Sequence, residues 1–138
     1  MNDAEVINIP LYSTMKLTIK GVPEDSFTIN VGKSRDIIAL QYNVHFSQGV
    51  DQSVINMRCI RDGTVLDKLM DTTFPFEGKK LFEVTISFNK DNFTIQETTC
   101  QSVQFKNSLD FPYYDYIWID GDVAIKGISI NSRPTRRC

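Results

Sequence analysis

A strict alternation of apolar and polar residues between Phe82 and Phe88 constrains the fold more than any other feature of this chain. The segment reads, in order, Phe82, Glu83, Val84, Thr85, Ile86, Ser87 and Phe88. A period of two places one apolar face against a core and one polar face toward solvent, as in a half-buried β-strand. Turn-forming residues follow at 89–92, and Phe93 and Ile95 resume the alternation, which predicts an antiparallel hairpin.

The same signal recurs along the rest of the chain. We predict further strands at 15–20, 27–31, 37–46, 54–60, 64–70, 102–105, 116–119 and 123–130. Residues 21–23, Gly32 and Asp62-Gly63 are turn signals that end or join these runs. No segment has a helical period with capping residues. Short strands without crossover helices predict an all-β fold, a two-sheet antiparallel β-sandwich of the jelly-roll type.

The bulk composition excludes some classes of protein. The 138 residues, of which 41% are apolar, suit a single domain with a sizeable core and no internal linker. The formal net charge of −2 comes from mixed signs, which argues against a nucleic-acid partner. Arg133, Arg136 and Arg137 are interpreted as a solvated tail, since basic nucleic-acid footprints are usually larger.

Targeting signals and metal-binding spacings are missing from the sequence. The first residues are acidic, without the apolar segment of a signal peptide, and no segment has the length of a membrane span. These features predict a cytoplasmic protein that does not insert into membranes. Cys59, Cys100 and Cys138 have no metal-binding spacing and are expected to be reduced thiols. His45 is the single histidine, which excludes a histidine-based metal cluster, and we expect no metal and no cofactor.

Several short motifs follow one another along the chain in a characteristic order. They are Leu40-Gln41-Tyr42-Asn43-Val44-His45-Phe46, Asp62-Gly63, Phe74-Pro75-Phe76 with Gly78, and the segments 82–86, 92–95 and 119–123. Together they resemble a galectin carbohydrate-recognition domain over roughly residues 10–131. The resemblance implies one galectin-like domain, 1–138, with short tails and a galectin/concanavalin-like sandwich. It also implies a metal-free, non-enzymatic lectin that binds β-galactosides on a concave face.

The resemblance carries expectations about partners and location as well. It implies glycans or glycoproteins as ligands and, for a cytoplasmic protein of this family, export without a signal peptide. Galectins often pair through edge strands near the chain termini. The segments 15–20 and 123–130 are therefore the expected edges of a homodimer.

The ligand residues of galectins follow three strand patterns, His-x-Asn-x-Arg, Val-x-Asn and Trp-x-x-Glu-x-Arg. The corresponding positions carry Gln41, Asn43 and His45 in the first pattern, and Val65, Lys68 and Met70 in the third. In these two patterns, only Asn43 keeps the residue of the family. Two residues are open for the second pattern. Counting without gaps from Phe46 and Phe74 gives Arg58. A shift of two gives Asn56, on the same strand face, and makes Val54-Ile55-Asn56 a literal Val-x-Asn.

These departures predict a remodelled carbohydrate site. Charge-assisted hydrogen bonds of an Arg–Glu network are worth roughly 1.5–3 kcal/mol each, and an aromatic platform on the order of 1 kcal/mol or more. Trp118, the single tryptophan, is too far along the sequence to supply that platform. We therefore expect altered specificity, for β-galactoside-related or other glycans. The alternative is a galectin fold without sugar binding that acts in protein–protein contacts.

Charged and nucleophilic residues near the same strands allow two further hypotheses. Arg58, Arg61 and Lys68 can bring positive charge to the concave face, which would suit a sulfated or sialylated glycan, although ordinary surface charge is the alternative. Cys59 and His45 could mimic a Cys–His nucleophile. Only weak orienting groups and no oxyanion loop accompany them, so we expect no enzyme activity.

Overall fold

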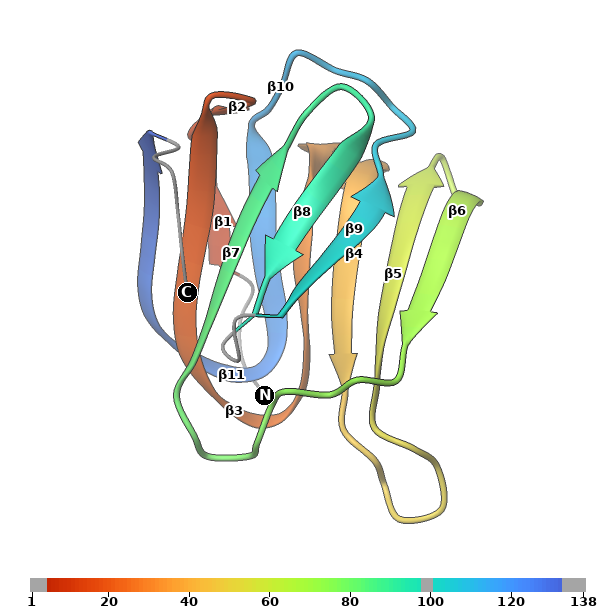
Figure 1. The fold of residues 1–138 in the computed structure, drawn as a ribbon, viewed down its shortest axis with the longest axis vertical. Helices are drawn as coiled ribbons and strands as arrows, with labels where there is room; N and C mark the ends of the chain where they lie inside the picture. Colours follow the sequence, from red (N-terminus) through yellow and green to blue (C-terminus); the bar gives the residue numbers. More distant parts are fainter. Residues whose placement is uncertain (1–4, 98–100, 133–138) are drawn as a thin grey trace.

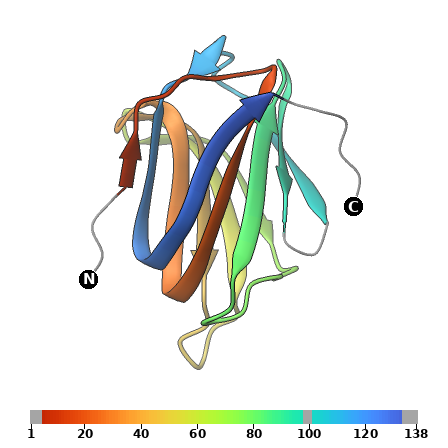
Figure 2. The same ribbon diagram turned by 90° about the vertical axis from the view of Figure 1, so that its left-hand side faces the viewer.

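A computed structural model describes residues 5–97 and 101–132, and this part of the chain is all-β, without a helix. Two antiparallel layers pack face to face (Figure 1, Figure 2). The predicted two-sheet antiparallel sandwich is thereby confirmed. Cys100, Cys138 and the basic residues Arg133, Arg136 and Arg137 lie outside the described residues.

The strand order defines the two layers. The strands are β1 (Glu5–Ile7), β2 (Leu11–Tyr12), β3 (Met15–Ser34), β4 (Ile37–His45), β5 (Val54–Arg61), β6 (Thr64–Asp71), β7 (Phe82–Phe88), β8 (Asn92–Gln96), β9 (Ser102–Lys106), β10 (Tyr113–Tyr114) and β11 (Tyr116–Ser132). One layer runs β6-β5-β4, then the second half of β3, the first half of β11, and β1. The other runs β9-β8-β7, then the first half of β3 and the second half of β11.

The long strands β3 and β11 pass through both layers and bend from one to the other at one end of the sandwich (Figure 2). They pair from Tyr116 opposite Gly32 to Ser132 opposite Met15. The predicted strand breaks at 21–23 and between 119 and 123 are therefore wrong. The backbone stays paired there through a register shift between Gly121 and Val123, and proline is compatible with strands at such irregularities.

Gly121 allows the bend of β11. Its φ is 105°, a left-handed backbone conformation that residues other than glycine rarely adopt. A Cβ atom at this position would lie 2.6 Å from the Cα atom of Phe27, which is closer than real contacts. The Asp120-Gly121-Asp122 sequence is thus a bend within one strand, whereas its residue types alone predict a turn between two separate strands.

Three short strands, β1, β2 and β10, were not predicted. Each has at most 3 residues, too few to show an alternation. β2 and β10 pair with each other, and β1 pairs with β11 beside Trp118. Their pairing depends on neighbours distant in sequence, which local patterns do not reveal.

The core lies between the layers and is largely aromatic and aliphatic. Tyr42, Met57 and Ile86 are fully enclosed. The Phe76 ring lies 5.4 Å from the Phe82 ring, in edge-to-face geometry. The alternation of β7 predicted from the sequence is realised, since Phe82, Val84, Ile86 and Phe88 are all buried.

One polar pair crosses this core. The buried Tyr42 hydroxyl of β4 donates a hydrogen bond to the Glu97 carboxylate, which follows β8 in the opposite layer. Burial raises the pKa of Tyr42 well above its ordinary value of 10.0, and the Glu97 charge adds to the shift. Burial also raises the pKa of Glu97, although the hydrogen bond from Tyr42 opposes that change. The pair thus satisfies a carboxyl group that would otherwise be buried without a partner.

Of the two segments expected at edges, only one is an edge. In β3, Thr18 pairs with Thr85 of β7 on one side and with Ser129 of β11 on the other. The segment 15–20 is therefore interior, which corrects the prediction. The second half of β11 has β3 on one side and no other paired strand among the described residues. In the layer that contains β4, the strand β6 is an edge strand.

Candidate functional site

Three polar side chains of β4 point away from the core, and each is held by a hydrogen bond. Gln41 Nε2 donates to Asn30 Oδ1 at 3.3 Å, and Asn43 Nδ2 donates to Thr28 Oγ1 at 2.9 Å. His45 Nε2 lies 2.5 Å from Asp51 Oδ2. The predicted ladder on β4 is therefore present, with each head group fixed by a neighbouring strand or loop. Fixed polar groups are what oriented recognition of a ligand requires.

The neighbouring strands extend this ladder into two rows. Arg58 of β5 lies opposite Gln41 of β4 and Lys68 of β6. Asn56 lies opposite Asn43 on one side and Met70 on the other. Directly opposed residues in antiparallel strands share a face of the sheet. We call this surface the outer face, formed by Gln41, Asn43, His45, Asn56, Arg58, Val65, Lys68 and Met70.

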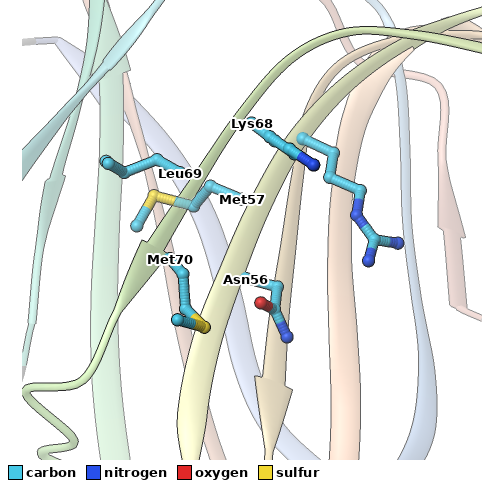
Figure 3. A pocket seen from close by; sticks show the side chains of 6 residues that line it. Asn56, Met57, Lys68, Leu69 and Met70 are labelled. Atoms are coloured by element: carbon cyan, nitrogen blue, oxygen red, sulfur yellow. The ribbon is translucent and has the colours of Figure 1, made fainter.

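Asn56 and Arg58, the two candidates for the second pattern, both belong to this outer face. They occupy successive outward positions of β5, separated by the buried Met57. Figure 3 shows Asn56 and Lys68 on one side of the strands, with Met57 and Leu69 directed to the other. The rows therefore bring both candidates beside β6, in accord with the strand period of two.

Two hollows lie along β5 and β6. One has a volume of about 440 Å³ and is lined by Asn56, Met57, Arg58, Lys68, Leu69 and Met70 (Figure 3). The other, of about 450 Å³, is lined by Arg58, Val65, Leu66, Asp67 and Lys68. Both are of the size that small-molecule sites occupy. The side chains predicted on β5 and β6 thus surround space for a ligand, with cations, one amide and thioether surface at hand.

Asp51 belongs to the site although sequence reasoning missed it. Its carboxylate accepts from the Gln48 backbone N–H at 2.7 Å and contacts the His45 ring. The hydrogen bond from His45, together with that from the Gln48 backbone, lowers the pKa of Asp51 to about 2. Asp51 lies in the loop between β4 and β5, where no alternation marks it. The sole sequence signal is its position in a polar turn after His45.

Trp118 lies across the sheet from β6 and is enclosed. It is 4% exposed, with the Arg35 guanidinium 5.1 Å above its ring and the Tyr116 ring at 5.2 Å. Its strand, β11, is separated from β6 by β3, β4 and β5. Trp118 therefore does not occupy the position of the tryptophan in the third galectin pattern, which corresponds to Val65 on β6, as expected from the sequence.

Cys59 and His45 face opposite sides of the sheet. Cys59 is fully buried in the core, whereas His45 projects from the outer face. Burial, with the Asp67 charge, raises the pKa of Cys59 to about 11, so the thiol is protonated at neutral pH. These two residues do not form a nucleophile pair. Within the described residues, no three His, Cys, Asp or Glu side chains are grouped to hold a metal ion, and no helix could span a membrane.

Comparisons with known proteins give the class to which this fold and face belong. A family model described as galactoside-binding lectin matches residues 4–130. The chain is 35% identical to galactose-binding lectin l-1 of Anguilla japonica over 143 aligned residues, covering 99% of this chain and 100% of that protein. The fold is thus that of the β-sandwich lectins. The chain belongs to the galactoside-binding lectin family, the galectins.

Solved structures agree with this assignment. A structure of congerin II with lactose and MES matches with a TM-score of 0.87 and 30% identity, covering 94% of this chain and 100% of that chain. A homodimeric agglutinin from chicken liver matches with a TM-score of 0.85, covering 94% of this chain and 100% of that one. Its identity of 23% shows the fold alone. The galectin resemblance expected from the sequence is confirmed.

Proposed function

We propose that this protein binds glycans on the outer face of β4, β5 and β6, without a metal ion and with a specificity altered from the β-galactoside norm. The observation that carries the proposal is the row of prearranged polar groups on β4. Gln41, Asn43 and His45 are each oriented by a partner from another strand or loop. Groups oriented before binding lose less conformational entropy when they meet sugar hydroxyls.

The altered specificity follows from the side chains beside that row. Val65, Lys68 and Met70 stand where the family pattern has Trp, Glu and Arg, and all three are exposed. The carboxylate that accepts from sugar hydroxyls is replaced by an ammonium, which only donates. A branched aliphatic side chain replaces the aromatic platform. We expect weaker binding of simple galactosides than the family pattern provides.

A glycan-array screen combined with an NMR titration of lactose tests this proposal. We expect retention of some glycans and chemical-shift changes centred on β4, β5 and β6. Asn43→Ala should abolish the retention, because Asn43 is central in the row and keeps the family residue. Asn131→Ala, at an exposed position of β11, is the matched control. Silence across the array, with lactose also inert, would refute glycan binding.

One observation favours a protein partner as a second candidate function. The edge strand β6 exposes Val65, Leu66, Leu69 and Met70 by 47%, 48%, 41% and 61%. Four apolar side chains on one edge strand are unusual unless something covers them. If the array is silent, β6 is the surface on which to seek that partner, and cross-linking from a cysteine placed at Thr64 would test it.

We also propose that the free edge of β11 pairs with a second copy of the chain. The support is the unpaired outer side of its second half among the described residues, and the homodimeric state stated for the chicken agglutinin. Sedimentation equilibrium distinguishes a dimer from a monomer. A proline placed in the second half of β11, at a position whose backbone N–H faces away from β3, removes a donor from the free edge and should shift a dimer toward monomer. A monomer at all concentrations would contradict pairing.

A further inference from the structure

The outer face has two cations directly opposed across β5 and β6. Arg58 and Lys68 are register partners in the antiparallel ladder, and both side chains are exposed. Like charges directly opposite one another destabilise a sheet, so this arrangement is unfavourable without a neutralising group. An anion placed between the two cations would remove the repulsion and gain a charge-assisted hydrogen bond from each.

The nearby acids do not supply that anion. None of the ion pairs Lys33–Asp115, His45–Asp51 and Lys80–Glu77 includes Arg58 or Lys68. The nearest acid in sequence, Asp67, lies opposite Cys59 and accepts from the Lys68 backbone N–H at 2.9 Å. Asp51, the acid in the loop after the polar row of β4, is hydrogen-bonded to His45. Within the described part of the chain, neither Arg58 nor Lys68 therefore forms an ion pair, and Asp67, which lines one of the hollows, accepts from the Lys68 backbone.

The cation pair also borders space for a ligand. Arg58 and Lys68 line both hollows on β5 and β6, of about 440 Å³ and 450 Å³. Asn56 adds an amide to the hollow of about 440 Å³, and Met70 adds thioether surface. We call Arg58, Lys68 and the two hollows beside them the cationic corner. Gln41, opposite Arg58, connects this corner to the polar row of β4. A ligand reaching from β4 to β6 would thus meet amides first and cations last.

We propose that this corner recognises an oxyanion carried by a glycan, a sulfate ester or a sugar carboxylate. The inference rests on the glycan binding proposed above and names the substituent that the site selects. The planar guanidinium of Arg58 can donate two parallel hydrogen bonds to such a group, and the Lys68 ammonium adds a point charge. Neutral β-galactosides would leave the two cations facing one another.

Titrations of the ¹⁵N-labelled protein with three probes test the proposal: lactose, lactose sulfated on its galactose, and sialylated lactose. We expect at least one anionic probe to bind about tenfold more tightly than lactose at low ionic strength. Raising the salt from about 0.05 M to about 0.5 M should reduce that preference, because exposed charges are screened. The two anionic probes separate sulfate from carboxylate, and preference for either supports the proposal.

Matched double variants identify the residues. Arg58→Gln with Lys68→Gln should abolish the preference. Lys106→Gln with Lys126→Gln changes the net charge equally, at exposed positions of β9 and β11 in the other layer, and should preserve it. A preference that survives the first double variant, or equal binding of all three probes, overturns the inference while glycan binding stands. Binding of no glycan on the array or in the titrations overturns both.

Discussion

Adjacent residues of β5 face opposite environments. Met57 is fully buried between the layers, whereas Arg58 is exposed on the outer face. The same contrast separates Tyr42 from Asn43 on β4, since Tyr42 is fully buried and Asn43 is partly exposed. The inner face keeps the apolar pattern that builds the sandwich, and the outer face carries every departure from the galectin ligand patterns. The change of specificity that we propose would therefore lie on one face and leave the packing of the other unaltered.

The largest effect should come from opening the inner face. Met57→Ala removes a fully buried side chain and should lower the free energy of unfolding by about 2–5 kcal/mol. The neighbouring Arg58→Ala should change it by less than about 0.5 kcal/mol, since its side chain is solvated. Urea unfolding followed by tryptophan fluorescence measures both. Equal losses in the two variants would contradict the division between the faces.

A smaller effect is expected from the polar pair within the core. Tyr42→Phe leaves the Glu97 carboxylate without its hydroxyl donor, so stability should fall by about 1–3 kcal/mol at neutral pH. Tyr12→Phe removes a hydroxyl from a half-exposed ring and is the matched control. A neutral result for Tyr42→Phe would mean that the carboxyl group finds another partner.

The same pair should make stability depend on pH. Burial raises the pKa of Glu97 above its ordinary value of 4.5, so the folded state retains this proton more strongly than the unfolded state does. The contribution is complete below pH 4.5 and is lost as the pH rises through the raised folded-state value. Glu97→Gln keeps an oxygen that accepts from Tyr42 but cannot ionise. Relative to this variant, the native chain should lose stability as the pH rises above 4.5, as measured by urea unfolding at each pH.

On the outer face, Asn43→Ala should act chiefly on binding. The loss of the hydrogen bond to Thr28 should reduce the free energy of unfolding by about 1 kcal/mol. Glycan retention should disappear, because the central amide of the row is gone. Thr28→Val removes the same hydrogen bond but leaves the amide, and should weaken retention less. Equal retention by both variants would show that Asn43 acts only by holding β3 to β4.

The smallest change should be a gain in stability. Lys68→Glu converts the like-charged pair with Arg58 into an opposite-charged pair, which should add about 0.2–1 kcal/mol to the free energy of unfolding. The new carboxylate should also occupy Arg58 and abolish the preference for anionic glycans. Thermal unfolding at low and high salt measures the gain, which should shrink as salt is added. A loss of stability would contradict the opposition of the two cations.

The extent of sequence prediction differs between the two faces. The period of two identified the strand faces correctly around Asn43, Arg58 and Lys68, because side-chain direction in a strand is a local property. Contacts made by partners distant in sequence were beyond reach. The Tyr42–Glu97 pair joins residues 55 positions apart, and Asp51 meets His45 through a loop conformation. Gly121 resembled an ordinary turn residue, since a bend within a paired strand has the same local chemistry as a turn between strands.

The continuity of β3 and β11 has a consequence for how the molecule opens. These strands contribute hydrogen bonds to both layers, so neither layer can separate from the other without breaking the ladder between them. The sandwich should therefore unfold as one cooperative unit, with similar slow amide exchange at Ile19 and Ile29, which lie in different layers of the same strand. A ligand that holds β4 to β6 should slow the opening of β7 as well. Binding on the outer face would then be detectable in the protection of amides on the far layer.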